Sequence, residues 1–274
     1  MVDKNAITHW LITHKDLFKL AYKQYDWPDR YSLGLYDFSC HLNFENIKSE
    51  GRGTSTDPDL AIEKASAEVI ERYICLKLNI PSVGVAVSGE KSALIHAQNE
   101  ALERYYLNNH LELKWPFKKV DLANHSTASL SALLNKLTSS FKMVNIDFYQ
   151  MHTPPDNVGI ICSIQHLEAN FYSFGFSFDS EYSTGLERSF LEAIPNIAAI
   201  SNDDLSKRPW HLSDDFKARL LPLLSNSVNY PEKDFPLTSP QLEIESLNMD
   251  LFPELKNCPI NPVRVNILNS KAEL

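Results

Sequence analysis

The hydrophobic and polar positions of the chain follow helical and extended spacings in turn, and one helical pattern occurs twice. Residues 61–73 read AIEKASAEVIERY and residues 93–105 read ALIHAQNEALERY, with six identities in thirteen positions. Alanine, glutamate, arginine and leucine dominate, and neither segment contains glycine or proline. Both segments are therefore predicted to be helices.

The first copy has two distinct faces when it is drawn as a helix. Small and charged side chains share a face about 120° wide: Ala61, Ala65, Glu68, Glu71 and Arg72. Apolar side chains form a second stripe, which is predicted to be the buried one: Ile62, Val69 and Tyr73.

The rest of the pattern predicts an α/β chain in which helices pack on mixed β-sheets. Asp57 or Thr56 is predicted to cap the first repeated helix, with Pro58 at its first position. Further helices are predicted over 7–25, 130–137 and 181–200, the last kinked or interrupted by Pro195. Strands are predicted over 33–44, 83–87, 113–120, 143–150, 159–163, 171–178 and 263–267. Beyond residue 201 the many prolines predict a tail that wraps the main domain.

Composition narrows the classes of protein that fit. The net charge of −9 argues against a nucleic-acid partner, which needs a basic face. No stretch approaches the roughly 20 apolar residues that a membrane-spanning helix requires. The N-terminus does not read as a secretory signal, and four cysteines lie far apart without metal-ligand spacing. A cytoplasmic protein without membrane contact is therefore expected.

The Glu-x-x-Glu-Arg pattern allows two interpretations. Glu68–Arg72 and Glu100–Arg104 have the spacing of simple surface ion pairs along a helix. Alternatively, the carboxylates gather where paired helices meet and hold Mg²⁺ that bridges phosphate oxygens. The Gly51-Arg52-Gly53 segment just before the first helix is predicted to be a turn whose backbone N–H groups approach phosphate. It lacks the spacing of a P-loop.

At these residues the sequence resembles the YcaO domain family. That family has a Gly-Lys-Gly turn followed by a helix of the type S-A-x-x-E-x-x-E-R-Y. A second helix ends in E-x-x-E-R, and a third carries R-A-x-x-E-x-x-Q-x-R. This chain reads GRG at 51–53, EVIERY at 68–73, EALERY at 100–105 and RSFLEAIPNI at 188–197.

The resemblance implies an ATP- and Mg²⁺-dependent enzyme that phosphorylates the oxygen of a peptide backbone amide. That step prepares the amide for cyclodehydration, or for conversion to a thioamide or amidine, in the biosynthesis of modified peptides. Carried over by position, the ATP-binding residues are Arg52, Lys64, Glu71 and Arg104. The Mg²⁺ ligands are Glu68, Glu100, Glu103 and Glu192. No catalytic residue beyond these is assigned.

The sequence departs from the family pattern at several positions. Arg52 replaces the lysine between the glycines and keeps the positive charge. Lys64 replaces the serine of the first helix, and Pro195 and Ile197 replace the glutamine and arginine of the third. A non-catalytic homologue that serves as a scaffold or regulatory subunit is therefore the alternative.

The resemblance also implies partners and a domain plan. A ribosomal precursor peptide is the expected substrate, a leader-binding or E1-like protein is expected to deliver it, and a homodimer is possible. We predict one YcaO-like domain over 33–267, preceded by a helical segment over 1–32 and followed by a short tail over 268–274.

Overall fold

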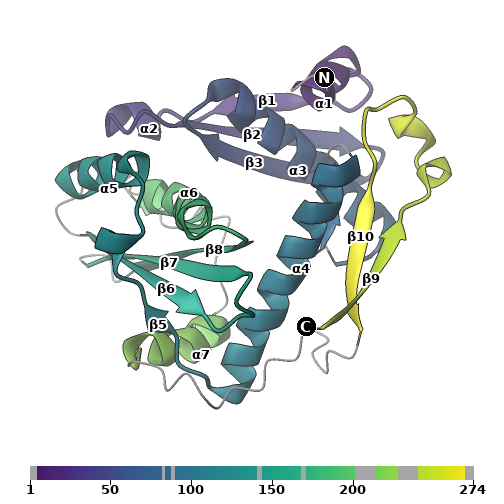
Figure 1. Cartoon of the computed structure of the whole chain (residues 1–274). Coiled ribbons are helices and arrows are strands. Elements are labelled where there is room, and N and C mark those ends of the chain that lie inside the picture. The colour runs from purple at the N-terminus through teal and green to yellow at the C-terminus, as the bar shows by residue number, and fades with distance from the viewer. Residues whose placement is uncertain are drawn as a thin grey trace. The chain divides into compact units, whose positions relative to one another are not determined.

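The structure is a computed structural model, and it describes residues 5–81, 84–87, 90–140, 144–167, 171–200, 214–227 and 240–268. These residues form two compact units (Figure 1). Unit 1 comprises residues 1–101 and 241–268, and unit 2 comprises residues 102–240 and 269–274. Helix α4 (Glu90–Leu113) begins in unit 1 and ends in unit 2.

Unit 1 contains two antiparallel sheets. The first has the order β1-β2-β3, formed by Ala21–Gln24, Tyr36–Phe44 and Ile47–Ser55. The second has the order β4-β10-β9, formed by Val85–Ala86, Val263–Leu268 and Gln241–Ser246. The helices of this unit outside α4 are α1 (Ala6–Thr13), α2 (Trp27–Arg30) and α3 (Pro58–Leu78). Two short 3₁₀ turns follow β9, namely η3 (Met249–Leu251) and η4 (Pro253–Leu255).

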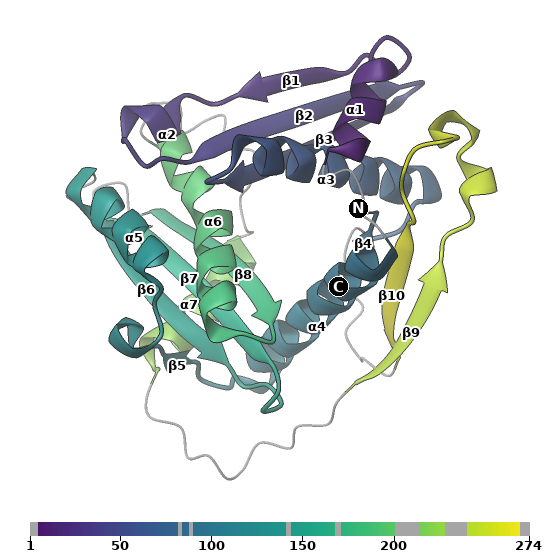
Figure 2. The same cartoon turned by 45° about the horizontal axis from the view of Figure 1, so that its top comes forward.

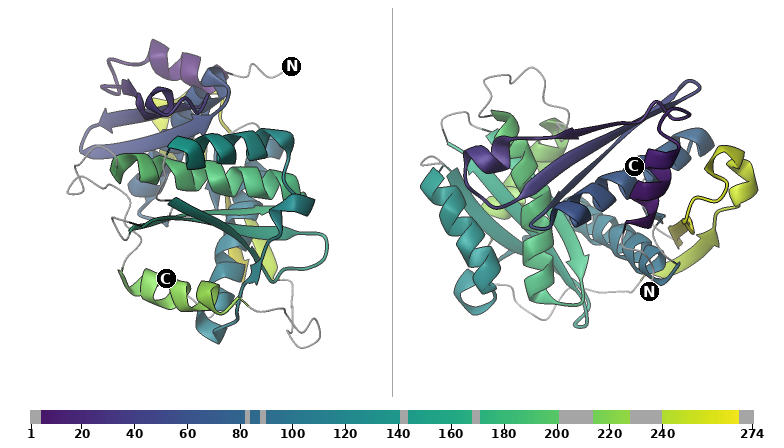
Figure 3. Two further views of the ribbon diagram at one scale, coloured as in Figure 1. Left: turned by 90° about the vertical axis from the view of Figure 1, so that its left-hand side faces the viewer. Right: turned by 90° about the horizontal axis from the view of Figure 1, so that it is seen from above.

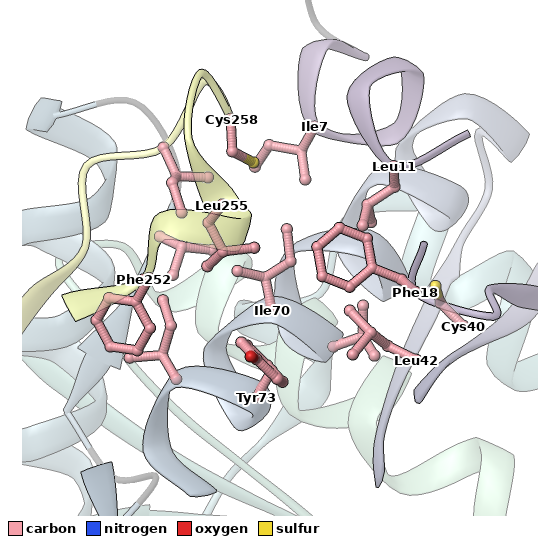
Figure 4. Packing of buried hydrophobic residues seen from close by; sticks show 14 of the residues in the cluster. Ile7, Leu11, Phe18, Cys40, Leu42, Ile70, Tyr73, Phe252, Leu255 and Cys258 are labelled. Carbon is pink, nitrogen blue, oxygen red and sulfur yellow. The ribbon is translucent and has the colours of Figure 1, made fainter. Parts of the chain in front are cut away.

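The core of unit 1 forms around α3 (Figure 4). Phe18 and Leu42 pack on one side of the helix residue Ile70. Phe252, which lies between the two C-terminal 3₁₀ turns, and Leu255 of η4 belong to the same cluster. The tyrosine of the first ERY motif, Tyr73, is fully buried, and its hydroxyl donates to Oε1 of Glu254 at 2.6 Å. Lys77 Nζ contacts the same oxygen at 2.6 Å. The C-terminal segment is thus fixed to the first repeated helix by polar as well as apolar contacts.

Unit 2 is a four-stranded antiparallel sheet with helices on both faces (Figure 3). Its order is β5-β6-β7-β8, formed by Lys118–Lys119, Val144–Met151, Val158–His166 and Phe171–Asp179. Helices α5 (Ala128–Ser140) and α6 (Tyr182–Ile200) lie on one side, and α7 (Asp214–Ser225) lies on the other. A 3₁₀ turn, η1 (Leu122–Asn124), precedes α5. On the α7 side, Tyr106 of α4 stacks on Phe178 with ring centroids 5.5 Å apart.

Several predicted elements are confirmed. Asp57 caps α3 by accepting from the backbone N–H groups of Asp59 and Leu60, and Pro58 is the first helical residue. Strands β6, β7, β8 and β10 lie where alternation predicts them. The helix predicted over 181–200 is confirmed as α6, but it continues through Pro195, so the interruption expected at that proline is wrong. None of the helices in the described ranges combines the length and apolar character needed to cross a membrane.

Other expectations are wrong. The helix expected over 7–25 ends at Thr13, because residues 21–24 pair with β2 as strand β1 and Lys19 has a positive φ of 43°. The sheets are not mixed, since every strand pairing in the described part of the chain is antiparallel. The strand expected over 113–120 is reduced to Lys118–Lys119, because α4 continues to Leu113.

The proline-rich C-terminal region does not form a single wrapping tail. Its residues 201–213, 228–239 and 269–274 lie outside the described ranges. Its described parts divide between the units, with α7 in unit 2 and β9 and β10 in a sheet of unit 1.

Candidate functional site

Gly51 and Gly53 lie inside strand β3 and not in a turn, which corrects the sequence-based expectation. Neither glycine has a positive φ. A Cβ on Gly51 would overlap the carbonyl oxygen of Ala65 and the amide nitrogen of Val69, and one on Gly53 would overlap the carbonyl oxygen of Ala61. The two glycines therefore let α3 lie directly on the strand. Ala61 and Ala65, which were expected on a charged face, are fully buried in this contact.

Arg52, between the two glycines, is held by a buried carboxylate. Its Nε and Nη2 donate to Oδ1 and Oδ2 of Asp37 at 3.0 and 2.5 Å. Asp37 is fully buried and also accepts from Trp27 Nε1 and Thr54 Oγ1. The guanidinium lies 4.7 Å from the ring centroid of Tyr25. Four donors thus satisfy Asp37, and Arg52 supplies the charge that makes its burial tolerable.

Glu68 connects α3 back to the strand that precedes it. Its Oε2 accepts from the backbone N–H of Arg52 at 2.6 Å, and its Oε1 accepts from Arg72 Nη2 at 2.5 Å. Arg72 also donates to the carbonyl oxygen of Glu50 at 2.9 Å. Burial raises the pKa of Glu68, and the Arg72 charge opposes that shift.

The same carboxylate contact occurs three times along the chain. Glu100 accepts from the backbone N–H of Gly84 at 3.0 Å, and Glu192 accepts from that of Phe176 at 2.7 Å. In every case, as with Glu68, the donor is 16 residues before the glutamate. The first glutamate of each motif therefore fastens its helix to the preceding segment.

Glu71, the second glutamate of the first motif, lies among other carboxylates. Its Oε1 accepts from the backbone N–H of Val87 at 3.3 Å. Burial, together with the charges of Glu100 and Glu68, raises its pKa to about 8. Unit 1 thus brings three predicted site residues, Glu68, Glu71 and Glu100, within electrostatic reach of one another. Lys64, on the same helix, is exposed, and its Nζ contacts the carbonyl oxygen of Thr54 at 3.3 Å.

Glu103, the second glutamate of the second motif, lies in unit 2 among cations. Its Oε1 is 3.7 Å from Nε of Arg104. Burial raises its pKa, while the charges of Arg104 and Arg188 oppose that shift. The Arg104 guanidinium lies 5.6 Å from the ring centroid of Phe176. The two copies of the ERY motif therefore present glutamates in opposite electrostatic surroundings.

The third motif, on α6, keeps only part of the pattern. Gly175 of β8 meets the helix backbone as Gly51 does, since a Cβ there would overlap the carbonyl oxygen of Ser189 and crowd the amide nitrogen of Ala193. Arg188 donates to Oδ2 of Asp179 at 2.9 Å. Pro195 stands where Glu71 and Glu103 stand in the other helices. The side chain of Ile197 lies outside the described residues.

Solved structures identify this fold. The structure of YcaO from Methanopyrus kandleri bound with AMPPCP and Mg²⁺ superposes with a TM-score of 0.68 at 12% sequence identity, covering 97% of this chain and 90% of that one. The chain has a YcaO-like fold. A heterocyclase in complex with substrate and cofactor superposes with a TM-score of 0.65 at 10% identity, covering 96% of this chain and 52% of that chain. The chain thus spans about half the length of the heterocyclase. The sequence itself matches no family model and no curated protein.

Several residues that organise this YcaO-like structure escape the sequence pattern. Asp37 fixes Arg52, Asp179 fixes Arg188, and Glu254 joins the two ends of unit 1. Asp37 gives the one available signal, because a lone acidic residue stands at a buried position of an alternating strand. Asp179 ends strand β8 only nine residues before Arg188, and Glu254 lies in η4, 181 residues from Tyr73. Neither pairing follows a spacing that the repeated motif shows.

Proposed function

We propose that this chain is an ATP- and Mg²⁺-dependent enzyme that activates a peptide backbone amide. The YcaO-like fold supports the reaction class, and the half-buried carboxylates of Glu68, Glu71 and Glu100 support the cation requirement. Carboxylates that lie close together in a site of low polarity resist ionisation, and a bound cation offsets that cost. The gathering of these carboxylates in unit 1, with Glu71 and Glu100 each held by a backbone N–H, is the observation that carries this proposal.

The donor set fits Mg²⁺ bound together with a nucleotide. Among the residues that the structure describes, no three acidic, histidine or cysteine side chains form a complete protein cage for a metal ion. Mg²⁺ in nucleotide sites takes one or two carboxylates, and phosphate oxygens and water fill its other positions. Glu71 with Glu100 is a pair of the kind required. Glu68, Glu103 and Glu192 as metal ligands, and Arg52, Lys64 and Arg104 as ATP contacts, remain predictions.

The nucleotide would supply the phosphoryl group that makes the amide oxygen a leaving group. The chain's own contribution would be placement and charge, since phosphoryl transfer relies on positioned cations and carboxylates more than on covalent catalysis. The substrate would be a ribosomal precursor peptide, delivered by a leader-binding or E1-like partner. Attack by a Cys, Ser or Thr side chain would complete a cyclodehydration, and an external nucleophile would give a thioamide or amidine.

Calorimetric titration with ATP–Mg²⁺ tests the proposal. Binding requires the ionised form of Glu71, so affinity should rise between about pH 6 and pH 9, with proton release on binding. The double variant Glu71→Gln, Glu100→Gln should lose binding and this pH dependence. The matched control is Asp16→Asn with Asp29→Asn, which removes two exposed charges elsewhere and should bind normally. Absence of ATP–Mg²⁺ binding by the unmodified chain would refute the proposed enzymatic function.

The third helix favours a second candidate, a non-catalytic scaffold or regulatory subunit. Pro195 stands where the family pattern has a polar glutamine, while the strand–helix contact of Glu192 stays intact. Incubation with ATP–Mg²⁺ and a pool of Cys-, Ser- and Thr-containing peptides separates the two candidates. Loss of one water from a peptide, with release of phosphate, supports the enzymatic function. Binding of ATP without turnover supports the scaffold function, provided that turnover is also absent when the partner protein of an active homologue is present.

A further inference from the structure

Strand β9 forms the outer edge of the second sheet of unit 1 (Figure 2). All six of its residues pair with β10, from Gln241 opposite Leu268 to Ser246 opposite Val263, with no bulge. No other strand in the described ranges pairs with β9. Its second edge therefore offers a regular row of backbone N–H and C=O groups, which is the template for addition of another strand.

The side chains of β9 are unusually accessible for a strand of this regularity. Five of its six residues are exposed, and Leu242 is half-buried. Ile244, at the centre, is 51% exposed although it lies opposite Val265, which is 3% exposed. An exposed central isoleucine is an apolar contact for a strand placed beside it. The strand contains neither proline nor lysine, the residues that most often block edges.

The charges on β9 favour one class of peptide at this edge. Because side chains alternate, Glu243 and Glu245 lie on one face of the sheet, and Leu242 and Ile244 lie on the other. A second copy of β9 would bring glutamates against glutamates, which is unfavourable. We propose that the β9 edge binds an extended peptide segment in which lysine or arginine alternates with apolar residues. The partner's basic side chains lie beside Glu243 and Glu245, and its apolar side chains lie beside Ile244.

Synthetic peptides test the proposal on the full chain. The probe is a fluorescein-labelled, end-capped peptide of alternating isoleucine and lysine, followed by fluorescence anisotropy. It should bind, while an isoleucine–glutamate peptide of the same length should not. An isoleucine–lysine peptide that is N-methylated along one backbone edge retains its charge but cannot form the ladder, and its binding should be lost. Equal binding of the methylated and unmethylated peptides would show plain charge attraction and overturn strand addition.

A variant of β9 tests whether the peptide binds at this edge. Glu243→Lys with Glu245→Gln should weaken the basic peptide by about tenfold or more, because cross-strand charge attraction becomes repulsion. Glu245 is neutralised and not reversed, since Arg264 lies directly opposite it. The matched control, Asp16→Lys with Asp29→Asn, changes the net charge equally at exposed positions and should bind as the parent does. Equal weakening in both variants, no binding at all, or a dimer that only the β9 variant abolishes would each overturn the proposal.

Discussion

In unit 1, α3 lies on β3 across Gly51, and in unit 2, α6 lies on β8 across Gly175. Each helix carries a glutamate that accepts the backbone N–H of the residue after that glycine, at 2.6 Å for Glu68 and 2.7 Å for Glu192. The two pairs therefore share a local construction, although their sequences share little else.

The pairs differ one turn further along the helix. Unit 1 places Glu71 and Arg72 there, and unit 2 places Pro195 and Asn196. Since α6 packs in the same way without the second glutamate and the arginine, the strand–helix contact does not require them. The first glutamate thus has a structural role in this contact, and the second glutamate has none.

Replacing Gly51 or Gly175, the glycines at which helix and strand meet, should have the largest effect on stability. Gly51→Ala and Gly175→Ala each force a Cβ against helix backbone atoms, which cannot move aside as a flexible side chain can. We expect each variant to lose at least about 3 kcal/mol of unfolding free energy, measured by denaturant titration.

A third glycine provides the control. A Cβ on Gly159 would meet only side-chain atoms of Met151 and Thr153, at 3.1 to 3.3 Å. Gly159→Ala should therefore cost less than about 1 kcal/mol. A similar loss for all three variants would show that the destabilisation does not depend on close approach to a helix backbone, since strand propensity alone favours alanine over glycine.

Removal of the fastening glutamates should have the next largest effect. Glu68→Ala and Glu192→Ala each leave a backbone N–H without its acceptor, which costs about 1–3 kcal/mol. Glu68→Ala should lower the unfolding free energy more than Glu192→Ala, because Arg72 also loses the carboxylate oxygen that lies 2.5 Å away. Glu192→Gln should retain most of the stability, since its amide oxygen still accepts the backbone N–H, and Glu68→Gln should retain less. Glu187→Ala, on α6, should change stability by under about 0.5 kcal/mol, and equal losses at 187 and 192 would contradict the fastening role.

The sequence predicts the helices of these pairs well because their composition and caps act locally. Asp57 and Pro58 define the start of α3 by local hydrogen bonding and fixed φ. Gly51-Arg52-Gly53 was misread as a turn because a glycine that permits close approach looks the same in sequence as one that permits a positive φ. The partners of the site residues could not be predicted either, since Asp37 meets Arg52 only through the β2–β3 register.

The smallest effect compares the second glutamates, and it should differ in size, because carboxylates surround Glu71 and cations surround Glu103. The pKa of Glu71 is raised to about 8 from 4.5, so folding retains a proton that the unfolded chain releases, and stability is lost as pH rises between these values. Glu71→Gln removes that cost and should stabilise unit 1 at pH 7 by about 1–2 kcal/mol, allowing for partial solvent screening. Burial also raises the pKa of Glu103, but the charges of Arg104 and Arg188 oppose that shift, so Glu103→Gln should stabilise the protein less than Glu71→Gln does at the same pH. Thermal unfolding of both variants from about pH 5 to pH 9 measures this, and stabilisation of equal size would show that neighbouring charges do not distinguish the two glutamates.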